Sequence, residues 1–347
     1  MSASTNPILF LGSTGYLGGS ILARLLVHPR VQEFDITALV RSPEKASVLQ
    51  SKFGVKTVIG SNADLDKLEN LSAQSYIVFS CADSDDLDAI KAIFRGLKKR
   101  KASTGKTPLL IHTSGTAYLN DDARGLHTTE VIYDDTNVEQ IQNLPPTAFH
   151  RNVDLAIEEA DAEGFLKSYN VTPSTIWGAP STPLVDAGIQ NTGSIQIPYL
   201  IKAGLGRGQG GMVGKGVPQW ANVNIDDVAD LYIVILNALL TNPDSVGHGR
   251  EGYYFGENGE HTWYELCKEI SKALYELGRG KSPEPTAFTT DELVKYFGSE
   301  MFGYFFGTNS RCRANRGRAL GWKPTRTTAD MLASIKAEVE RVIAKSG

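Results

Sequence analysis

The stretch Ile8-Leu9-Phe10-Leu11-Gly12-Ser13-Thr14-Gly15-Tyr16-Leu17-Gly18 decides the fold of this chain. Its four apolar residues predict a buried strand, and the apolar stripe from Ile21 to Leu26 predicts a helix that ends at Pro29. Glycines at such a junction let the backbone approach a pyrophosphate that the helix N-terminus can face. The spacing is GxxGxxG rather than the GxGxxG of dinucleotide dehydrogenases, but its position between strand and helix predicts a dinucleotide-binding loop. The loop residues expected at the cofactor are Gly12, Thr14, Gly15, Tyr16, Leu17 and Gly18.

Short apolar runs recur after this loop, with helical stretches between several of them. They occupy residues 36–40, 55–59, 76–81, 109–113 and 171–176. Strands that alternate with helices predict an α/β fold with a parallel, doubly wound Rossmann sheet. We expect a Rossmann domain over residues 1–180 and about 221–250. A smaller C-terminal substrate-binding lobe is expected over residues 181–220 and 251–347, and the glycine-rich stretch from Pro180 to Trp220 is predicted to be loop-rich and to cover the ligand crevice.

The composition excludes several classes of function. With 35 Lys and Arg against 39 Asp and Glu, the net charge is −4, which gives no general attraction to nucleic acid or anionic lipid. No apolar run is long enough for a membrane span, and the N-terminus lacks the pattern of a signal peptide. The three cysteines and six histidines show neither disulfide nor metal-site spacing. We therefore expect a cytoplasmic protein without a metal, whose partner is a small-molecule substrate; a homodimer is compatible with the sequence.

The end of the second predicted strand bears on the choice between NAD(H) and NADP(H). An acidic side chain there would bind the ribose 2′-hydroxyl, whereas an arginine would pair with a 2′-phosphate. The strand ends at Val40 and Arg41, with Lys45 nearby, and Asp35 lies at its opposite end. We therefore favour NADP(H) over NAD(H), with Arg41 and Lys45 at the phosphate. The alternative is that Arg41 is a solvated surface charge.

Motifs beyond the glycine loop are similar to those of the extended short-chain dehydrogenase/reductases, the family of sugar-nucleotide epimerases and dihydroflavonol-type reductases, and especially of their atypical relatives. The likeness covers most of the chain and includes Gly60 and Asp64, Cys81-Ala82, His112-Thr113-Ser114, the turn Pro173-Ser174-Thr175-Ile176-Trp177-Gly178, Val223 to Ala229, and Leu320-Gly321-Trp322-Lys323-Pro324. The resemblance implies that Asp64 lies near the adenine and that the turn after Pro173 passes the nicotinamide. It also places Cys81, Ala82, Thr113, Pro173, Thr175 and Ile176 at the cofactor.

The catalytic group of this family is a Ser or Thr with a Tyr-x-x-x-Lys pair, in which the tyrosine donates a proton and the lysine holds the nicotinamide ribose. Ser114 matches the serine, but His150 and Asp154 stand where the tyrosine and lysine should be. The only Tyr-x-x-x-Lys in the chain is Tyr264 and Lys268, in the C-terminal part, where we expect no nicotinamide. Both key residues are therefore replaced.

We expect His150 and Asp154 to act in place of the missing pair. A helix is predicted from about Thr147 to about Gly164, and positions four apart share one face of it. A carboxylate beside an imidazole favours the protonated ring, so His150 would be the general acid, and Asp154 would pair with it or hold the ribose hydroxyls. Ser114 would orient the substrate oxygen. The alternative is a local salt bridge between His150 and Asp154 without a catalytic role.

These features favour an NADP(H)-dependent oxidoreductase that reduces a carbonyl group, or oxidises the matching alcohol, on a small organic substrate. Two other functions stay open. Loss of the tyrosine and lysine suits a non-catalytic NADP(H)-binding redox sensor, and the resemblance also covers an epimerase or dehydratase that retains its cofactor. Neither the substrate nor the direction of the reaction follows from the sequence.

Overall fold

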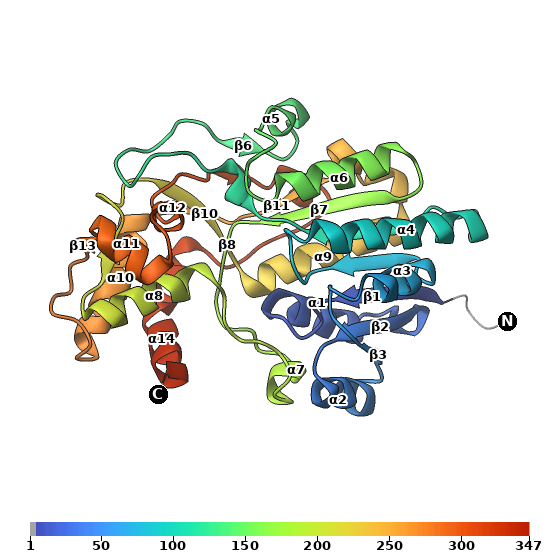
Figure 1. Cartoon of the computed structure of the whole chain (residues 1–347), viewed down its shortest axis with the longest axis horizontal. Coiled ribbons are helices and arrows are strands. Elements are labelled where there is room, and N and C mark those ends of the chain that lie inside the picture. The colour runs from blue at the N-terminus through green and yellow to red at the C-terminus, as the bar shows by residue number, and fades with distance from the viewer. Residues whose placement is uncertain (1–4, 347) are drawn as a thin grey trace.

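The computed structural model describes residues 5–346, and a parallel sheet of seven strands forms its centre (Figure 1). All neighbouring strands in this sheet are parallel. The strand order reverses between β1 and β4, and the expected doubly wound α/β sheet is confirmed. The spatial order is β3 (Lys56–Ile59), β2 (Phe34–Val40), β1 (Asn6–Leu11), β4 (Ile77–Ser80), β5 (Leu109–Thr113), β7 (Lys167–Pro173) and β11 (Tyr253–Gly256).

Two helical layers cover the sheet (Figure 1). Successive side chains of a strand point to opposite faces, so Ile8 and Phe10 pack in the core of one layer, whereas Leu9 and Leu11 pack in the core of the other. Within residues 5–346, no helix is both long and apolar enough to cross a membrane. The first layer contains α1 (Tyr16–Leu26), α2 (Pro43–Phe53) and α9 (Ile225–Thr241), and the second contains α3 (Leu65–Ala73), α4 (Leu87–Thr104) and α6 (Arg151–Ala162).

A second apolar core lies beyond the carboxyl ends of the central strands (Figure 1). Trp220 and Trp263 are buried in it, with ring centroids 5.6 Å apart. The stretch from Pro180 to Trp220 is rich in loop, but it also contains α8 (Gln196–Arg207), whose Ile197 and Ile201 pack into this core at helical spacing. The helices of this core are α8 (Gln196–Arg207), α10 (Trp263–Glu276), α11 (Thr290–Phe297), α12 (Glu300–Phe305) and α14 (Thr328–Ser346), and the adjoining sheet consists of β8 (Thr175–Trp177), β10 (Gln219–Asn224) and β12 (Glu260–Thr262).

The C-terminal part of the chain returns to the central sheet. β11 is the edge strand of that sheet, although its residues fall in the range expected for the second lobe. Ion pairs hold the basic segment 311–318 against residues that follow β11. Arg318 pairs with Glu257 at 2.7 Å, and Arg311 pairs with Glu260 at 3.0 Å. The remaining short α-helices and strands are α5 (Val138–Gln142), α7 (Pro183–Asp186), α13 (Asn315–Ala319), and the paired strands β6 (Tyr133–Asp134) with β14 (Cys312–Arg313) and β9 (Gly211–Met212) with β13 (Thr286–Ala287).

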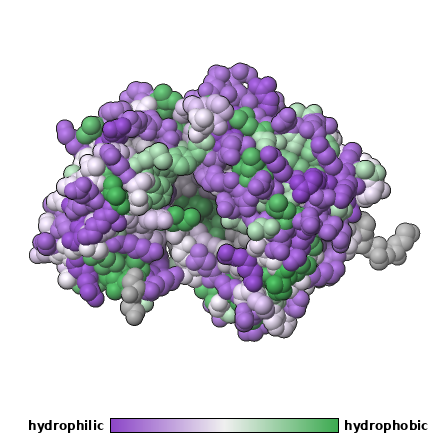
Figure 2. Space-filling model, in the orientation of Figure 1, coloured by the Kyte–Doolittle hydropathy of each residue, from purple (hydrophilic) through white to green (hydrophobic). Residues whose placement is uncertain are grey.

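The surface is hollowed between the central sheet and the second core, and apolar side chains are visible inside the hollow (Figure 2). The carboxyl ends of the central strands point toward it (Figure 1). In open α/β sheets, ligands bind outside the carboxyl ends of the strands at the point where the strand order reverses. The junction of β1 and β4 is that point here.

Candidate functional site

The glycine loop joins β1 to α1 and leaves space beside its middle glycine. Gly12 has a φ of +81°, and a Cβ on it would lie 2.4 Å from the carbonyl oxygen of Cys81. A Cβ on Gly18 would lie 2.2 Å from the carbonyl oxygen of Gly12, whereas one on Gly15 would meet the same oxygen at 3.0 Å. Gly12 and Gly18 thus let the loop fold closely against β4 and α1, and Gly15 keeps its outer side open.

The loop fits the pyrophosphate of a dinucleotide. Gly15 is the N-cap residue of α1, no side chain caps that end, and the first turn contains no acidic residue. The buried Ser13 Oγ has no hydrogen-bond partner within residues 5–346. A bound pyrophosphate would accept hydrogen bonds from these groups and lie at the positive end of the helix.

Three other loop residues, Thr14, Tyr16 and Leu17, make contacts that hold the loop in place. Tyr16 OH donates to the carbonyl oxygen of Gly178 at 2.6 Å. The carbonyl oxygen of Thr14 accepts from Asn191 N at 2.9 Å, and Leu17 is buried in the core below α1. The segment from 178 to 191 therefore holds the loop in place.

Arg41 and Lys45 lie where β2 ends and α2 begins. The Arg41 side chain is exposed, and no hydrogen bond or ion pair joins it to another residue between 5 and 346. Asp35, at the opposite end of β2, forms an ion pair with Lys56 at 2.7 Å. Asp64, expected near the adenine, is the N-cap residue of α3 and accepts a hydrogen bond from the backbone of the same loop. The end of β2 therefore presents a guanidinium group to solvent.

Cys81 and Ala82 follow β4, a neighbour of β1 in the sheet, and Thr113 is the last residue of β5, the strand on the other side of β4. Cys81 and Ala82 lie directly against Gly12. Burial raises the pKa of the Cys81 thiol to about 12, so it is not a thiolate at neutral pH. Thr113 Oγ1 shares a hydrogen bond of 2.6 Å with Tyr232 OH on α9.

The turn after β7 carries the last of the predicted cofactor residues. Pro173 ends β7, and Thr175 and Ile176 belong to β8, which pairs with β10. Ser174 Oγ donates to the carbonyl oxygen of Gly256 on β11 at 2.7 Å and so ties the turn to the central sheet. Thr175 is fully buried, and its hydroxyl lacks a partner among the described residues.

His150 is not part of the helix predicted for it. α6 begins at Arg151, and His150 precedes it as the N-cap residue with a φ of +64°, a left-handed value that an α-helix excludes. Its Nδ1 is hydrogen-bonded to Asp85 Oδ1 at 2.7 Å. Its Nε2 faces Gly115, where a Cβ would lie 3.1 Å away. The carboxylate paired with His150 is therefore Asp85, and the expected pairing with Asp154 is wrong.

Asp154 pairs with Ser114 instead. Ser114 Oγ donates to Asp154 Oδ2 at 2.9 Å, and both residues are buried. Burial raises the pKa of Asp154 to about 7, although the hydrogen bond from Ser114 and the charge of His150 act in the opposite direction. Because Asp154 is completely buried, it is not placed to hold ribose hydroxyls, which was our other expectation for it.

The structure thus brings Ser114, Gly115 and His150 together at the carboxyl end of β5. Asp85 completes this group, and the sequence analysis missed it. The signal was an acidic loop, residues 83–86, directly after the fourth predicted strand. No spacing rule links Asp85 to His150, because 65 positions separate them in the chain.

The only Tyr-x-x-x-Lys of the chain lies on α10, away from this group. Tyr264 OH donates to Glu284 Oε2 at 3.2 Å, and Lys268 forms an ion pair with the same carboxylate. Both side chains are therefore bound to Glu284.

Comparisons with known proteins agree with this fold. The NmrA-like family profile matches residues 4–100, which contain the glycine loop and β1 to β4. The chain is 30% identical over 337 residues to the oxidase ucsJ of an Acremonium species, a match that covers 92% of this chain and 93% of that protein.

Solved structures show the same architecture at low identity. The PbgP3 protein from Burkholderia pseudomallei has a TM-score of 0.66 at 15% identity, over 98% of this chain and 99% of that one. A dTDP-glucose 4,6-dehydratase from Bacillus anthracis, solved in complex with NAD, has a TM-score of 0.62 at 14% identity, over 97% of each chain. With the glycine loop, the strand order and a nearly full-length relative established, the chain belongs to the extended short-chain dehydrogenase/reductases, NAD(P)-binding Rossmann proteins similar to epimerases and dehydratases, and its α6 lacks the Tyr-x-x-x-Lys pair.

Proposed function

We propose that this chain is an NADP(H)-dependent oxidoreductase that reduces a carbonyl group, or oxidises the matching alcohol, on a small organic substrate. The observation that carries the proposal is the grouping of Ser114, Gly115 and His150 at the end of β5, which only β4 separates from β1 and its glycine loop. The relative at 30% identity is named an oxidase, which supports redox chemistry.

The residues of the loop would hold the cofactor. The amide groups at the start of α1 and Ser13 Oγ would bind the pyrophosphate, and Arg41 would pair with the 2′-phosphate. Bound NADPH would supply a hydride to the carbonyl carbon. One proton added to the carbonyl oxygen balances the reaction, in which the carbonyl compound, NADPH and H⁺ give the alcohol and NADP⁺.

His150 would supply that proton from Nε2. The carboxylate of Asp85 on Nδ1 fixes the orientation of the ring. In the direction of alcohol oxidation, the neutral ring would take the proton back from the hydroxyl group.

Ser114 would orient the carbonyl oxygen. With a pKa of about 7, the Asp154 carboxyl group can hold a proton near neutral pH. A protonated Asp154 can donate to Ser114 Oγ, which leaves the serine O–H free to donate to the substrate. An ionised Asp154 instead accepts a hydrogen bond from the O–H of Ser114, so that O–H is no longer free to donate to the substrate oxygen.

Replacement of Arg41 tests the cofactor assignment. One charge-assisted contact is worth about 1.5 to 3 kcal/mol, so Arg41→Ala should weaken NADPH binding by roughly tenfold to a hundredfold in calorimetry. NADH binding should barely change, because NADH lacks the 2′-phosphate. Arg250→Ala, at another exposed arginine, is the matched control. Equal loss of affinity for both cofactors would reject the assignment of the phosphate site.

A screen for turnover tests the reaction. Aldehydes, ketones and sugar nucleotides are offered with NADPH, and its oxidation is followed. Reduction of a carbonyl compound is the expected result. Tight NADPH binding without turnover would identify a sensor, and cofactor that stays bound through purification would indicate an epimerase or dehydratase.

A further inference from the structure

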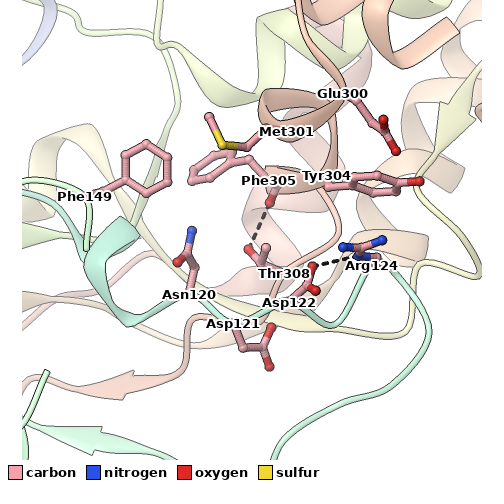
Figure 3. Close-up of a pocket in the computed structure, with 10 residues that line it drawn as sticks. All are labelled: Asn120, Asp121, Asp122, Arg124, Phe149, Glu300, Met301, Tyr304, Phe305 and Thr308. Atoms are coloured by element: carbon pink, nitrogen blue, oxygen red, sulfur yellow. Dashed lines mark hydrogen bonds and ion pairs between the residues drawn. The ribbon is translucent and has the colours of Figure 1, made fainter. Parts of the chain in front are cut away.

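A cavity of about 470 Å³ lies between α12 and the segment that follows η2 (Thr116–Leu119) (Figure 3). None of its residues belongs to the motifs described above. Ten side chains line it: Asn120, Asp121, Asp122, Arg124, Phe149, Glu300, Met301, Tyr304, Phe305 and Thr308.

The cavity adjoins the group at the end of β5 through both segments that form that group. Phe149 lines the cavity and directly precedes His150, and their ring centroids are 6.4 Å apart. In the second segment, Asn120 is the C-cap residue of the short helix η2, which begins directly after Gly115. A ligand in this cavity would therefore lie beside the side chains that we assign to proton transfer.

One side of the cavity is apolar. Figure 3 shows Phe149, Met301 and Phe305 close together, and the rings of Phe149 and Phe305 are 5.8 Å apart. Phe149 is 43% exposed and Met301 is 78% exposed. Large apolar side chains that remain exposed inside a cavity favour an apolar ligand, because the ligand removes their surface from water.

The charges of the cavity are mostly negative. Asp121, Asp122 and Glu300 contribute three carboxylates, against the single guanidinium of Arg124. That guanidinium already pairs with Asp122 at 2.8 Å and lies over the ring of Tyr304. None of the ten lining residues thus offers a free cation to a phosphate or carboxylate group, and Glu300 at the exposed start of α12 would repel one.

We propose that this cavity is the substrate pocket and that it takes an apolar carbonyl compound, aromatic or long-chain, without phosphate or carboxylate groups. The inference rests on the proposed oxidoreductase function and names its substrate class. It excludes nucleotide sugars, whose diphosphate would need the cation that the ten residues do not provide.

Binding without turnover tests the pocket. The probes are naphthalene-2-carbaldehyde, its 6-carboxylate derivative and dTDP-glucose, titrated by calorimetry into the protein saturated with NADP⁺. With this oxidised cofactor no reduction occurs. The neutral aldehyde should bind at least about tenfold more tightly than either anion, because one nearby like charge costs about that much.

Two pairs of variants assign this selectivity to the cavity. Glu300→Lys should improve binding of the carboxylate probe about tenfold, while Glu139→Lys, a glutamate in the first turn of α5 outside the cavity, should not. Met301→Asp should weaken binding of the neutral aldehyde about tenfold, while Val294→Asp, an exposed apolar residue on α11, should leave it unchanged. Tighter binding of either anion than of the neutral aldehyde would contradict the proposal that this cavity is the substrate pocket. Equal effects in a variant and its control would contradict it as well.

The outcome separates this inference from the proposed function. If the neutral aldehyde binds selectively but no substrate leads to oxidation of NADPH, the proposed pocket stands and the proposed oxidoreductase function is rejected. Reduction of anionic substrates in preference to neutral ones would retain the oxidoreductase and reject the pocket.

Discussion

The glycine loop and the start of α6 hold the two halves of the proposed site, and they are built in opposite ways. The loop is shaped mainly by main-chain atoms, such as the hydrogen bond from Gly15 N to Gly12 O at 2.8 Å and the close approach of Gly12 to the carbonyl group of Cys81. The start of α6 consists of side-chain contacts to distant loops, with His150 bound to Asp85 and Asp154 bound to Ser114.

This difference shows why one half keeps the pattern of its family and the other does not. A loop made of main-chain atoms depends on the absence of side chains, so Gly12 and Gly18 cannot be exchanged without a clash. A group made of side chains can be rebuilt with other residues, provided that new partners lie within reach. In this chain Asp85 supplies the partner of His150, and Ser114 supplies that of Asp154.

Removal of the imidazole should have the largest effect. If His150 is the general acid, His150→Ala should lower the turnover of carbonyl reduction by roughly a hundredfold to ten-thousandfold and leave NADPH affinity nearly intact. Steady-state assays with calorimetry of NADPH binding measure both. His127→Ala, at an exposed histidine, is the control and should be fully active. Full activity in His150→Ala would leave water or another side chain as the proton donor.

A side chain at Gly15 should affect the other half of the site alone. Gly15→Val places methyl groups where the pyrophosphate would lie, so binding of NADPH and NADH should fall by about a hundredfold or more. The melting temperature should drop only slightly, since a Cβ there meets one atom at 3.0 Å. Gly18→Ala is the contrast, because its Cβ would lie 2.2 Å from the carbonyl oxygen of Gly12 and should destabilise the fold itself. Retained affinity in Gly15→Val would show that the loop does not hold the cofactor.

The buried carboxyl group at Asp154 should make stability depend on pH. Its pKa is about 7 in the folded protein and about 4 in an unfolded chain, so protonation stabilises the fold at low pH, and this contribution is lost as the pH rises from about 4 to about 7. Asp154→Asn removes the ionisable group, so the variant should not lose this stability as the pH rises. Relative to wild type, the free energy of unfolding of the variant should rise by about 2 kcal/mol between pH 5 and pH 8.

Denaturant titrations at the two pH values measure this difference. Asp135, also buried with a pKa raised to about 7, is present in both proteins, so its contribution cancels. Asp66→Asn, at an exposed aspartate, should change stability equally at both pH values. The same result for Asp154→Asn would mean that Asp154 is ionised throughout this range.

Loss of the charge on Asp85 should have the smallest effect. Asp85→Asn can still hold His150 Nδ1 by a hydrogen bond, so we expect turnover to fall by only about tenfold. Asp83→Asn in the same loop is the control. Turnover equal to that of wild type would show that Asp85 has only a structural role.

The sequence by itself determined the parts of this protein that depend on neighbours in the chain. Alternating apolar strands and amphipathic helices predicted the doubly wound sheet, because hydrophobic periodicity reports which face of each element is buried. The glycines between the first apolar run and the first helical stripe predicted the loop, and the hydrogen bond from Gly15 N to Gly12 O that closes it is local. The place of Arg41 at the end of β2 followed from the same strand pattern.

Only the tertiary structure decided the partners of the side chains. His150 lies in a left-handed conformation before α6 instead of on its face, and that conformation is uncommon for a residue with a Cβ unless its surroundings hold it. Its partner Asp85 is 65 positions away, and the partner of Asp154 is 40 positions away. Such contacts are set by which strands become neighbours in the sheet and by how deeply each side chain is buried, and local periodicity contains neither quantity.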